Sequence, residues 1–151
     1  MSGKGGTGKT TLATAIARFL ANRGKKVLLV ELEEQSSVRA LLSESSRPSY
    51  QPSRLGLGFD WCKMQGRDCL VEYVSSFTKI ESVTQRFFDS ALLRTLINVA
   101  PGLNDLSILG KLTSRIRQHG PPLQYDHVVI DSLSTGRFYS LINTPVTLGS
   151  S

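Results

Sequence analysis

The sequence predicts an α/β fold in which a doubly wound, mainly parallel sheet is flanked by helices. A glycine-rich stretch, Gly3–Gly8, runs directly into a helical pattern over Lys9–Asn22. Two short apolar runs, Lys26–Glu31 and His127–Asp131, have the continuous hydrophobic character of parallel strands that are buried on both faces. A helix followed by a buried strand, directly after a glycine-rich turn, is the organisation of an open α/β sheet.

The composition is that of a globular domain. The chain has 151 residues, of which 40% are hydrophobic and 20% are charged. We assign residues 1–145 to one domain and residues 146–151 to a disordered tail. No apolar run approaches the roughly 20 residues that span a bilayer, and the chain starts in a glycine-rich loop rather than a signal peptide, so we expect a cytoplasmic protein. The net charge is +6, but the basic residues are scattered, which argues against a nucleic-acid partner.

The middle of the chain is less regular. Its patterns predict a short helix at Val38–Leu42, a loop at Ser45–Ser53 and a strand at Arg54–Asp60, where Leu55, Leu57 and Phe59 alternate with glycines. Helical spacing of apolar residues predicts helices over Cys69–Phe77, Phe88–Val99 and Leu103–Ile116, with Pro101-Gly102 as a break between the last two. In the first helix, the expected buried face is Leu12, Ile16, Ala17, Phe19 and Leu20. Cys62 and Cys69 fit no disulfide or zinc spacing, so we interpret them as small apolar residues, with a thiolate site for a soft metalloid as the alternative.

The glycine-rich stretch fits the pattern G-x-x-x-x-G-K-[ST], with Gly3, Gly8, Lys9 and Thr10 at the fixed positions. Glycines let successive backbone N–H groups turn toward an anion, and the following helix adds the positive end of its dipole. Lys9 can reach the β- and γ-phosphates of a nucleoside triphosphate, and the Thr10 hydroxyl can hold Mg²⁺. The predicted ATP-binding residues are therefore Gly3, Lys4, Gly5, Gly6, Thr7, Gly8, Lys9, Thr10 and Thr11. The alternative is a glycine-rich turn that happens to precede a helix.

Acidic residues follow both apolar runs. Asp131 ends the second run, where an acid at the carboxyl edge of the sheet can hold Mg²⁺ together with Thr10; the alternative is an aspartate that caps the next turn. After the first run, Glu33 is our candidate for orienting the water that attacks the γ-phosphate, and Glu31 is the second candidate. Both glutamates could equally be surface charges on a loop.

A second lysine, Lys4, makes the loop more specific. The segment Gly3–Thr11 resembles the deviant Walker A loop of the dimeric ATPases that include ParA, MinD, nitrogenase iron protein and the ArsA family. In that group the early lysine reaches across a dimer interface to the nucleotide of the partner. The resemblance therefore implies a homodimer, or a dimer with a related ATPase, in which Lys4 acts on the partner's ATP. The alternative is that Lys4 adds favourable charge beside its own phosphates.

Three further segments look like the ArsA family, whose members include arsenite-pump ATPases and ATPases that target tail-anchored membrane proteins. They are Val27–Glu33, Ala100–Leu106 with Gly110-Lys111, and Tyr125–Arg137. The resemblance implies Mg²⁺-dependent ATP hydrolysis with Lys4, Lys9, Glu33 and Asp131 as catalytic residues, and a membrane pump or a hydrophobic client as the partner. Glu33 would lie in the first switch and Asp131–Arg137 in the second, where Ser134 replaces the proline that members commonly have.

Two departures from the family bear on completeness. Only Met1-Ser2 precede Gly3, so the strand that should carry the loop is missing, and the chain ends before the family's adenine-binding residues. We therefore expect the N-terminal portion of an ArsA-type ATPase, with a fold that is incomplete at both ends. One alternative is a MinD/ParA-like positioning ATPase, although no basic surface patch or C-terminal amphipathic helix is visible. The other is a truncated, non-catalytic nucleotide-binding module.

Overall fold

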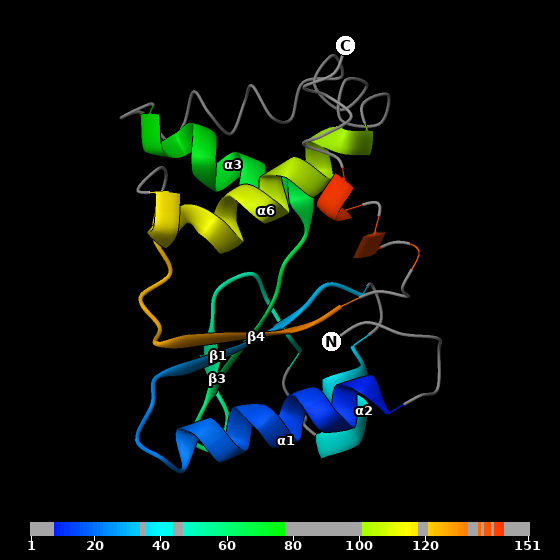
Figure 1. Cartoon of the computed structure of the whole chain (residues 1–151), viewed down its shortest axis with the longest axis vertical. Coiled ribbons are helices and arrows are strands. Elements are labelled where there is room, and N and C mark those ends of the chain that lie inside the picture. The colour runs from blue at the N-terminus through cyan, green and yellow to red at the C-terminus, as the bar shows by residue number, and fades with distance from the viewer. Residues whose placement is uncertain are drawn as a thin grey trace. The chain divides into compact units, whose positions relative to one another are not determined.

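The chain forms two compact units. The computed structural model describes residues 8–33, 36–43, 47–77, 101–117, 121–132, 136, 138–139 and 141–143. The first unit contains Met1–Met64 and Tyr125–Tyr139, and the second contains Gln65–Gln124 and Ser140–Ser151. The sheet belongs to the first unit together with helices α1 and α2, whereas helices α3 and α6 belong to the second (Figure 1). The single domain over residues 1–145 stays a prediction.

The sheet of the first unit has the strand order β2-β3-β1-β4. Strand β1 (Val27–Glu31) is fully buried and pairs in parallel with β3 (Asp60–Lys63) and with β4 (His127–Asp131). The short strand β2 (Ser53–Arg54) pairs antiparallel with β3. Because the three longer strands run in the same direction, their carboxyl ends meet at one edge of the sheet. The prediction of an α/β fold with a mainly parallel sheet is confirmed.

Helix α1 (Lys9–Ala21) packs on β1 and β4, and its buried face agrees with the expected one at Ala17, and in part at Leu20, but differs elsewhere. The buried residues are Ala13, Thr14 and Ala17, whereas Leu12 and Phe19 are 49% and 52% exposed. Small side chains let a helix approach a sheet closely, so its alanine face packs better than its larger residues would. The hydrophobic core that forms here consists of Ala13, Ala17, Val27, Leu29, Val38, Leu55, Phe59 and Trp61.

The strand predicted at Arg54–Asp60 is wrong, because this segment is the turn of a hairpin between β2 and β3. The Leu55 N–H donates to the Phe59 carbonyl at 3.0 Å, and Gly58 has a φ of +88° that only glycine adopts easily. Leu55 and Phe59 are nevertheless buried in the core. The alternating pattern thus predicted the burial of these residues correctly, but it wrongly predicted that their backbone is extended. The short helix predicted nearby is confirmed as α2 (Ser37–Leu42).

The second unit contains α3 (Gly66–Phe77) and α6 (Pro101–Arg117), which pack against each other. Pro101 is the first residue of α6 rather than a break before it, as suits a residue that needs no N–H partner there. The apolar spacing that predicts this helix, at Leu103, Leu106, Leu109, Leu112 and Ile116, does not match its burial at the end, since Ile116 is 84% exposed while Ile108 is buried. The predicted helix Phe88–Val99, the start of the predicted loop at Ser45–Ser46 and the tail 146–151 lie outside the described residues.

The two helices of the second unit enclose a pocket of about 280 Å³, lined by Cys69, Leu70, Glu72, Tyr73, Leu103, Leu106, Ser107, Gly110, Lys111 and Pro121. At its polar end Lys111 forms an ion pair with Glu72. Across the described residues, no helix is long and apolar enough to cross a membrane.

Candidate functional site

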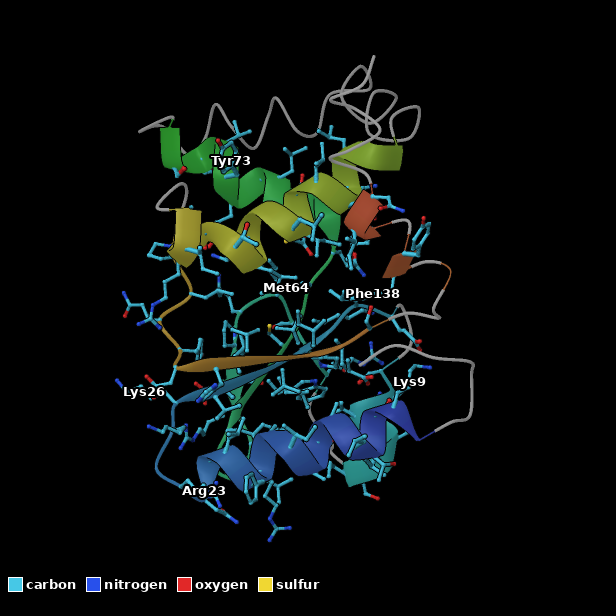
Figure 2. All side chains as sticks on the ribbon, in the orientation of Figure 1. Lys9, Arg23, Lys26, Met64, Tyr73 and Phe138 are labelled. Atoms are coloured by element: carbon cyan, nitrogen blue, oxygen red, sulfur yellow. The ribbon has the colours of Figure 1, made fainter. Side chains whose placement is uncertain are left out.

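Thr10 and Asp131 are joined by a hydrogen bond although 121 positions separate them in the chain. The Thr10 Oγ1 donates to the Asp131 Oδ2 at 2.6 Å. Thr10 belongs to the first turn of α1, and Asp131 is the last residue of β4 and only 6% exposed. Figure 2 shows Lys9 at this beginning of α1, whereas Lys26 precedes β1 at the other end of the unit. The two residues expected to share Mg²⁺ therefore lie in direct contact.

The start of α1 suits an anion. Gly8 is the N-cap with a φ of +74°, so it offers no side chain to the N–H groups of the first turn, and that turn carries no acidic residue. The positive end of the helix is therefore not neutralised from within the helix, and it faces the edge where Asp131 lies. The other predicted loop residues, Gly3, Lys4, Gly5, Gly6 and Thr7, lie outside the described residues and stay predictions.

The atoms at this edge fit Mg²⁺ by their chemistry. Mg²⁺ takes oxygen ligands and is usually held by one or two carboxylates together with substrate phosphates and water. The Thr10 hydroxyl and the Asp131 carboxylate supply two such oxygens. Next to Asp131, the Ser132 side chain is completely buried, and its Oγ has no hydrogen-bond partner among the described residues. Within the described ranges no group of three or more His, Cys, Asp or Glu could hold a metal on its own, so phosphate and water would complete the shell.

Glu31, the acidic residue that ends β1, directs its carboxylate into the protein interior and hydrogen-bonds to other residues there. Its side chain is 1% exposed. It accepts hydrogen bonds from the Ser36 Oγ at 2.7 Å, the Val38 N–H at 2.9 Å and the Trp61 Nε1–H at 2.9 Å. With both carboxylate oxygens engaged by the protein, Glu31 serves as an anchor, a role that the sequence analysis missed. The only feature of the sequence that could have indicated this role is the position of Glu31 at the end of a fully apolar run, a position that Asp131 shares.

Glu33, the predicted water-orienting residue, is half-buried in the segment that leads from β1 toward α2. It lies two positions beyond the strand end and thus near the same edge of the sheet. In the predicted second switch, Leu133, Ser134, Thr135 and Arg137 lie outside the described residues. Cys62 and Cys69 are buried and are not joined in a disulfide, as expected for small apolar residues.

The geometry of a glycine-started helix beside a strand-ending aspartate is that of a nucleotide-binding α/β domain. A family model described as the CobQ/CobB/MinD/ParA nucleotide binding domain matches residues 1–137. The chain belongs to this family. Its place in the family makes it a nucleotide-binding domain of ATPase type, and ATP the implied ligand.

Several curated relatives of this CobQ/CobB/MinD/ParA-type domain carry ATPase names. The chain is 31% identical over 145 residues to "ATPase BagA" of Mycobacterium tuberculosis, covering 91% of this chain and 42% of that protein. It is 29% identical to "Putative arsenical pump-driving ATPase 2" of Aquifex aeolicus, covering 97% of this chain and 48% of that protein. It is 23% identical to the "Arsenical pump-driving ATPase" of Escherichia coli, covering 95% and 24%. The chain thus spans less than half the length of these relatives.

Proposed function

We propose that this chain binds Mg²⁺·ATP and hydrolyses it as the nucleotide-binding part of an ArsA-type ATPase. The observation that carries the proposal is the 2.6 Å contact between the Thr10 hydroxyl and the Asp131 carboxylate, beside the start of α1. A hydroxyl from the phosphate-loop helix and an acid from a strand end are the protein groups by which P-loop ATPases hold Mg²⁺ on a nucleotide.

The proposed roles in binding and hydrolysis fall on separate groups at the start of α1 and at the ends of β1 and β4. Backbone N–H groups from Gly8 onward and the Lys9 ammonium bind the phosphates, and Thr10 and Asp131 hold the metal. When bound, Mg²⁺ neutralises charge that builds up on the phosphate oxygens during transfer. Glu33 orients the attacking water; its position just past β1, at the edge where Asp131 ends β4, supports this role.

The wider assignment is to ATP-driven transport or targeting through a dimer. Two of the relatives above are named arsenical pump-driving ATPases, which supports an ArsA-type role in anion or metalloid export, or in membrane-protein targeting. In this proposal Lys4 acts across the interface of a homodimer, or of a dimer with a related ATPase. A mass measurement in solution tests the dimer: addition of ATP·Mg²⁺ should raise the mass from that of the monomer to twice that value.

A second candidate is a MinD/ParA-like positioning ATPase, because the matching family is described by those proteins. Such an ATPase uses DNA or a membrane surface as its partner. Binding to DNA that weakens steeply with added salt would favour this candidate over the ArsA-type role.

Titration of ATP with and without Mg²⁺ tests the proposed function. We expect the wild-type chain to bind ATP at least tenfold more tightly with Mg²⁺ than with EDTA, and to release phosphate. Asp131→Asn keeps the shape of the side chain and an acceptor for Thr10 but removes the charge, so the Mg²⁺ effect should disappear. The matched control is Asp126→Asn, which makes the same change just before β4, where Asp126 accepts from the Lys26 N–H.

Two results would reject the proposal: wild type that binds ATP equally with and without Mg²⁺, or Asp131→Asn that behaves like Asp126→Asn. Mg²⁺-dependent binding without phosphate release would instead identify a non-catalytic nucleotide-binding module.

A further inference from the structure

The carboxylate of Glu31 joins the start of α2 and the side chain of Trp61 in β3 to the end of β1. We propose that Glu31 is a positioning residue of the nucleotide site, which fixes the segment that carries Glu33. This proposal rests on the proposed function, since Glu33 matters only if ATP is hydrolysed. The observation behind it is that one buried carboxylate accepts hydrogen bonds from Ser36, Val38 and Trp61.

The segment after β1 is held where it leaves the sheet. The Glu31 carbonyl accepts from the Met64 N–H at 3.0 Å, and the Leu32 N–H donates to the Asp131 carbonyl at 3.2 Å. The chain is thereby bonded to both neighbouring strands at the point of departure. Glu33 follows directly, so its backbone starts from a fixed position beside Asp131.

The same segment is held again where α2 begins. The Glu31 side chain binds the Ser36 hydroxyl and the Val38 N–H, so the start of the helix is attached to the end of the strand. Ser36 is also the N-cap of α2, because its Oγ accepts from the Arg39 N–H at 3.2 Å. The carboxylate therefore orders both the cap and the first turn of this helix.

Trp61 makes the anchor rigid. Its indole is completely buried in the core, and its Nε1–H donates to Glu31 at 2.9 Å. A charged acceptor that receives several hydrogen bonds in a dry environment has a strongly preferred position. Neutralising Glu31 turns one acceptor into an amide donor, which cannot satisfy all three partners. We therefore expect Leu32 and Glu33 to lose their fixed position beside Asp131.

Glu31→Gln separates this role from direct contact with the nucleotide. We expect the Kd for ATP·Mg²⁺ to stay within about twofold of wild type and kcat to fall at least tenfold, because the groups that the Glu31 side chain binds among the described residues, in Ser36, Val38 and Trp61, do not belong to the start of α1. Trp61 is the single tryptophan of the chain, so its emission reports the anchor directly. Its spectrum should shift in Glu31→Gln, whereas in Asp126→Asn emission, Kd and kcat should match wild type.

A double-mutant cycle identifies the residue through which Glu31 acts. If it acts through Glu33, Glu31→Gln should lower kcat no further, within about twofold, once Glu33→Gln is present. Should Glu31→Gln fail to fold, Ser36→Ala removes one of the three hydrogen bonds to Glu31, together with the N-cap of α2, and should show the same pattern, a lower kcat with unchanged Kd.

An active wild type together with an unchanged kcat in Glu31→Gln would overturn the positioning role and leave the proposed function standing. An undiminished effect of Glu31→Gln in the Glu33→Gln background would also overturn it. A wild type without Mg²⁺-dependent ATP binding would instead overturn the proposed function itself.

Discussion

Glu31 and Asp131 are register partners in the parallel pair of β1 and β4, and each holds the start of a different helix. Asp131 binds Thr10 in the first turn of α1, and Glu31 binds the Val38 N–H in the first turn of α2. Register partners in a parallel pair point to the same face of the sheet. The two helices also contact each other. The edge of the sheet therefore joins the predicted metal site and the segment that carries Glu33 through adjacent strand ends.

The hydroxyl of Thr10 can be tested separately from the rest of its side chain. Thr10→Ala removes the donor to Asp131 and the predicted metal ligand, so we expect the Kd for ATP·Mg²⁺ to rise at least tenfold, about 1.4 kcal/mol. Thr10→Ser keeps the hydroxyl and should bind within about threefold of wild type. Calorimetric titration measures both. Equal losses in the two variants would show that the methyl group, rather than the hydroxyl, matters.

Two glycines in the second unit should respond in opposite ways to alanine. A Cβ on Gly66 would overlap the Asn104 Cα, so Gly66→Ala must push α3 away from α6 and should cost about 2 kcal/mol or more. Among the described residues, a Cβ on Gly110 would meet no atom within 4 Å, so Gly110→Ala in the middle of α6 should stabilise by roughly 0.5–1 kcal/mol. Thermal unfolding followed by circular dichroism decides the sign of each change.

Tyr125 should make stability depend on alkaline pH. Burial and the hydrogen bond that its hydroxyl donates to Asp60 at 2.9 Å raise the pKa of Tyr125 above its ordinary value of 10.0. The folded state therefore keeps the proton while the unfolded state loses it. This contribution is complete below pH 10 and falls as the pH rises above 10. Tyr125→Phe should lose about 1 kcal/mol near pH 8, and that deficit should shrink above pH 10.

The control for this pH dependence is Tyr139→Phe, since Tyr139 is 69% exposed. Urea unfolding at pH 8, 9.5 and 11, followed by Trp61 emission, provides the comparison. A deficit of Tyr125→Phe that stays constant through pH 11 would contradict the raised pKa.

Lys111 and Glu72 form an ion pair, and replacing Glu72 should lower the free energy of unfolding more than replacing Lys111 does. The Lys111 side chain is 9% exposed and also donates to the Pro121 carbonyl at 3.1 Å, whereas Glu72 is 29% exposed. Glu72→Leu leaves a buried ammonium without its countercharge and should cost roughly 3 kcal/mol. Lys111→Met leaves a carboxylate that water can reach and should cost about 1 kcal/mol. Urea unfolding by circular dichroism measures both; a larger loss for Lys111→Met would refute this order.

Much of the first unit could be predicted because its signals are local. Helix α1, strand β1 and strand β4 each follow from an uninterrupted pattern of residues. The hairpin at Arg54–Asp60 could not, because alternating burial arises equally from a strand and from a turn whose apolar residues fold back onto the core. The buried face of α1 was missed for a related reason. How closely a helix approaches a sheet depends on the side chains of both the helix and the sheet. A sequence pattern could not predict this, because it ranks the residues of the helix by hydrophobicity alone.

The sequence by itself determined that Thr10 and Asp131 belong to one site, since a phosphate-loop helix and the carboxyl end of a parallel strand share an edge of the sheet in such folds. It did not distinguish the uses of the acids that end β1 and β4. Only the tertiary structure decided that Glu31 turns inward to Ser36, Val38 and Trp61 while Asp131 meets Thr10. The physical reason is that a buried carboxylate is stable only where hydrogen-bond donors satisfy its oxygens, and the positions of those donors are set by the tertiary structure. The indole that donates to Glu31 belongs to Trp61 in β3, and no local sequence pattern predicts that Trp61 lies beside Glu31.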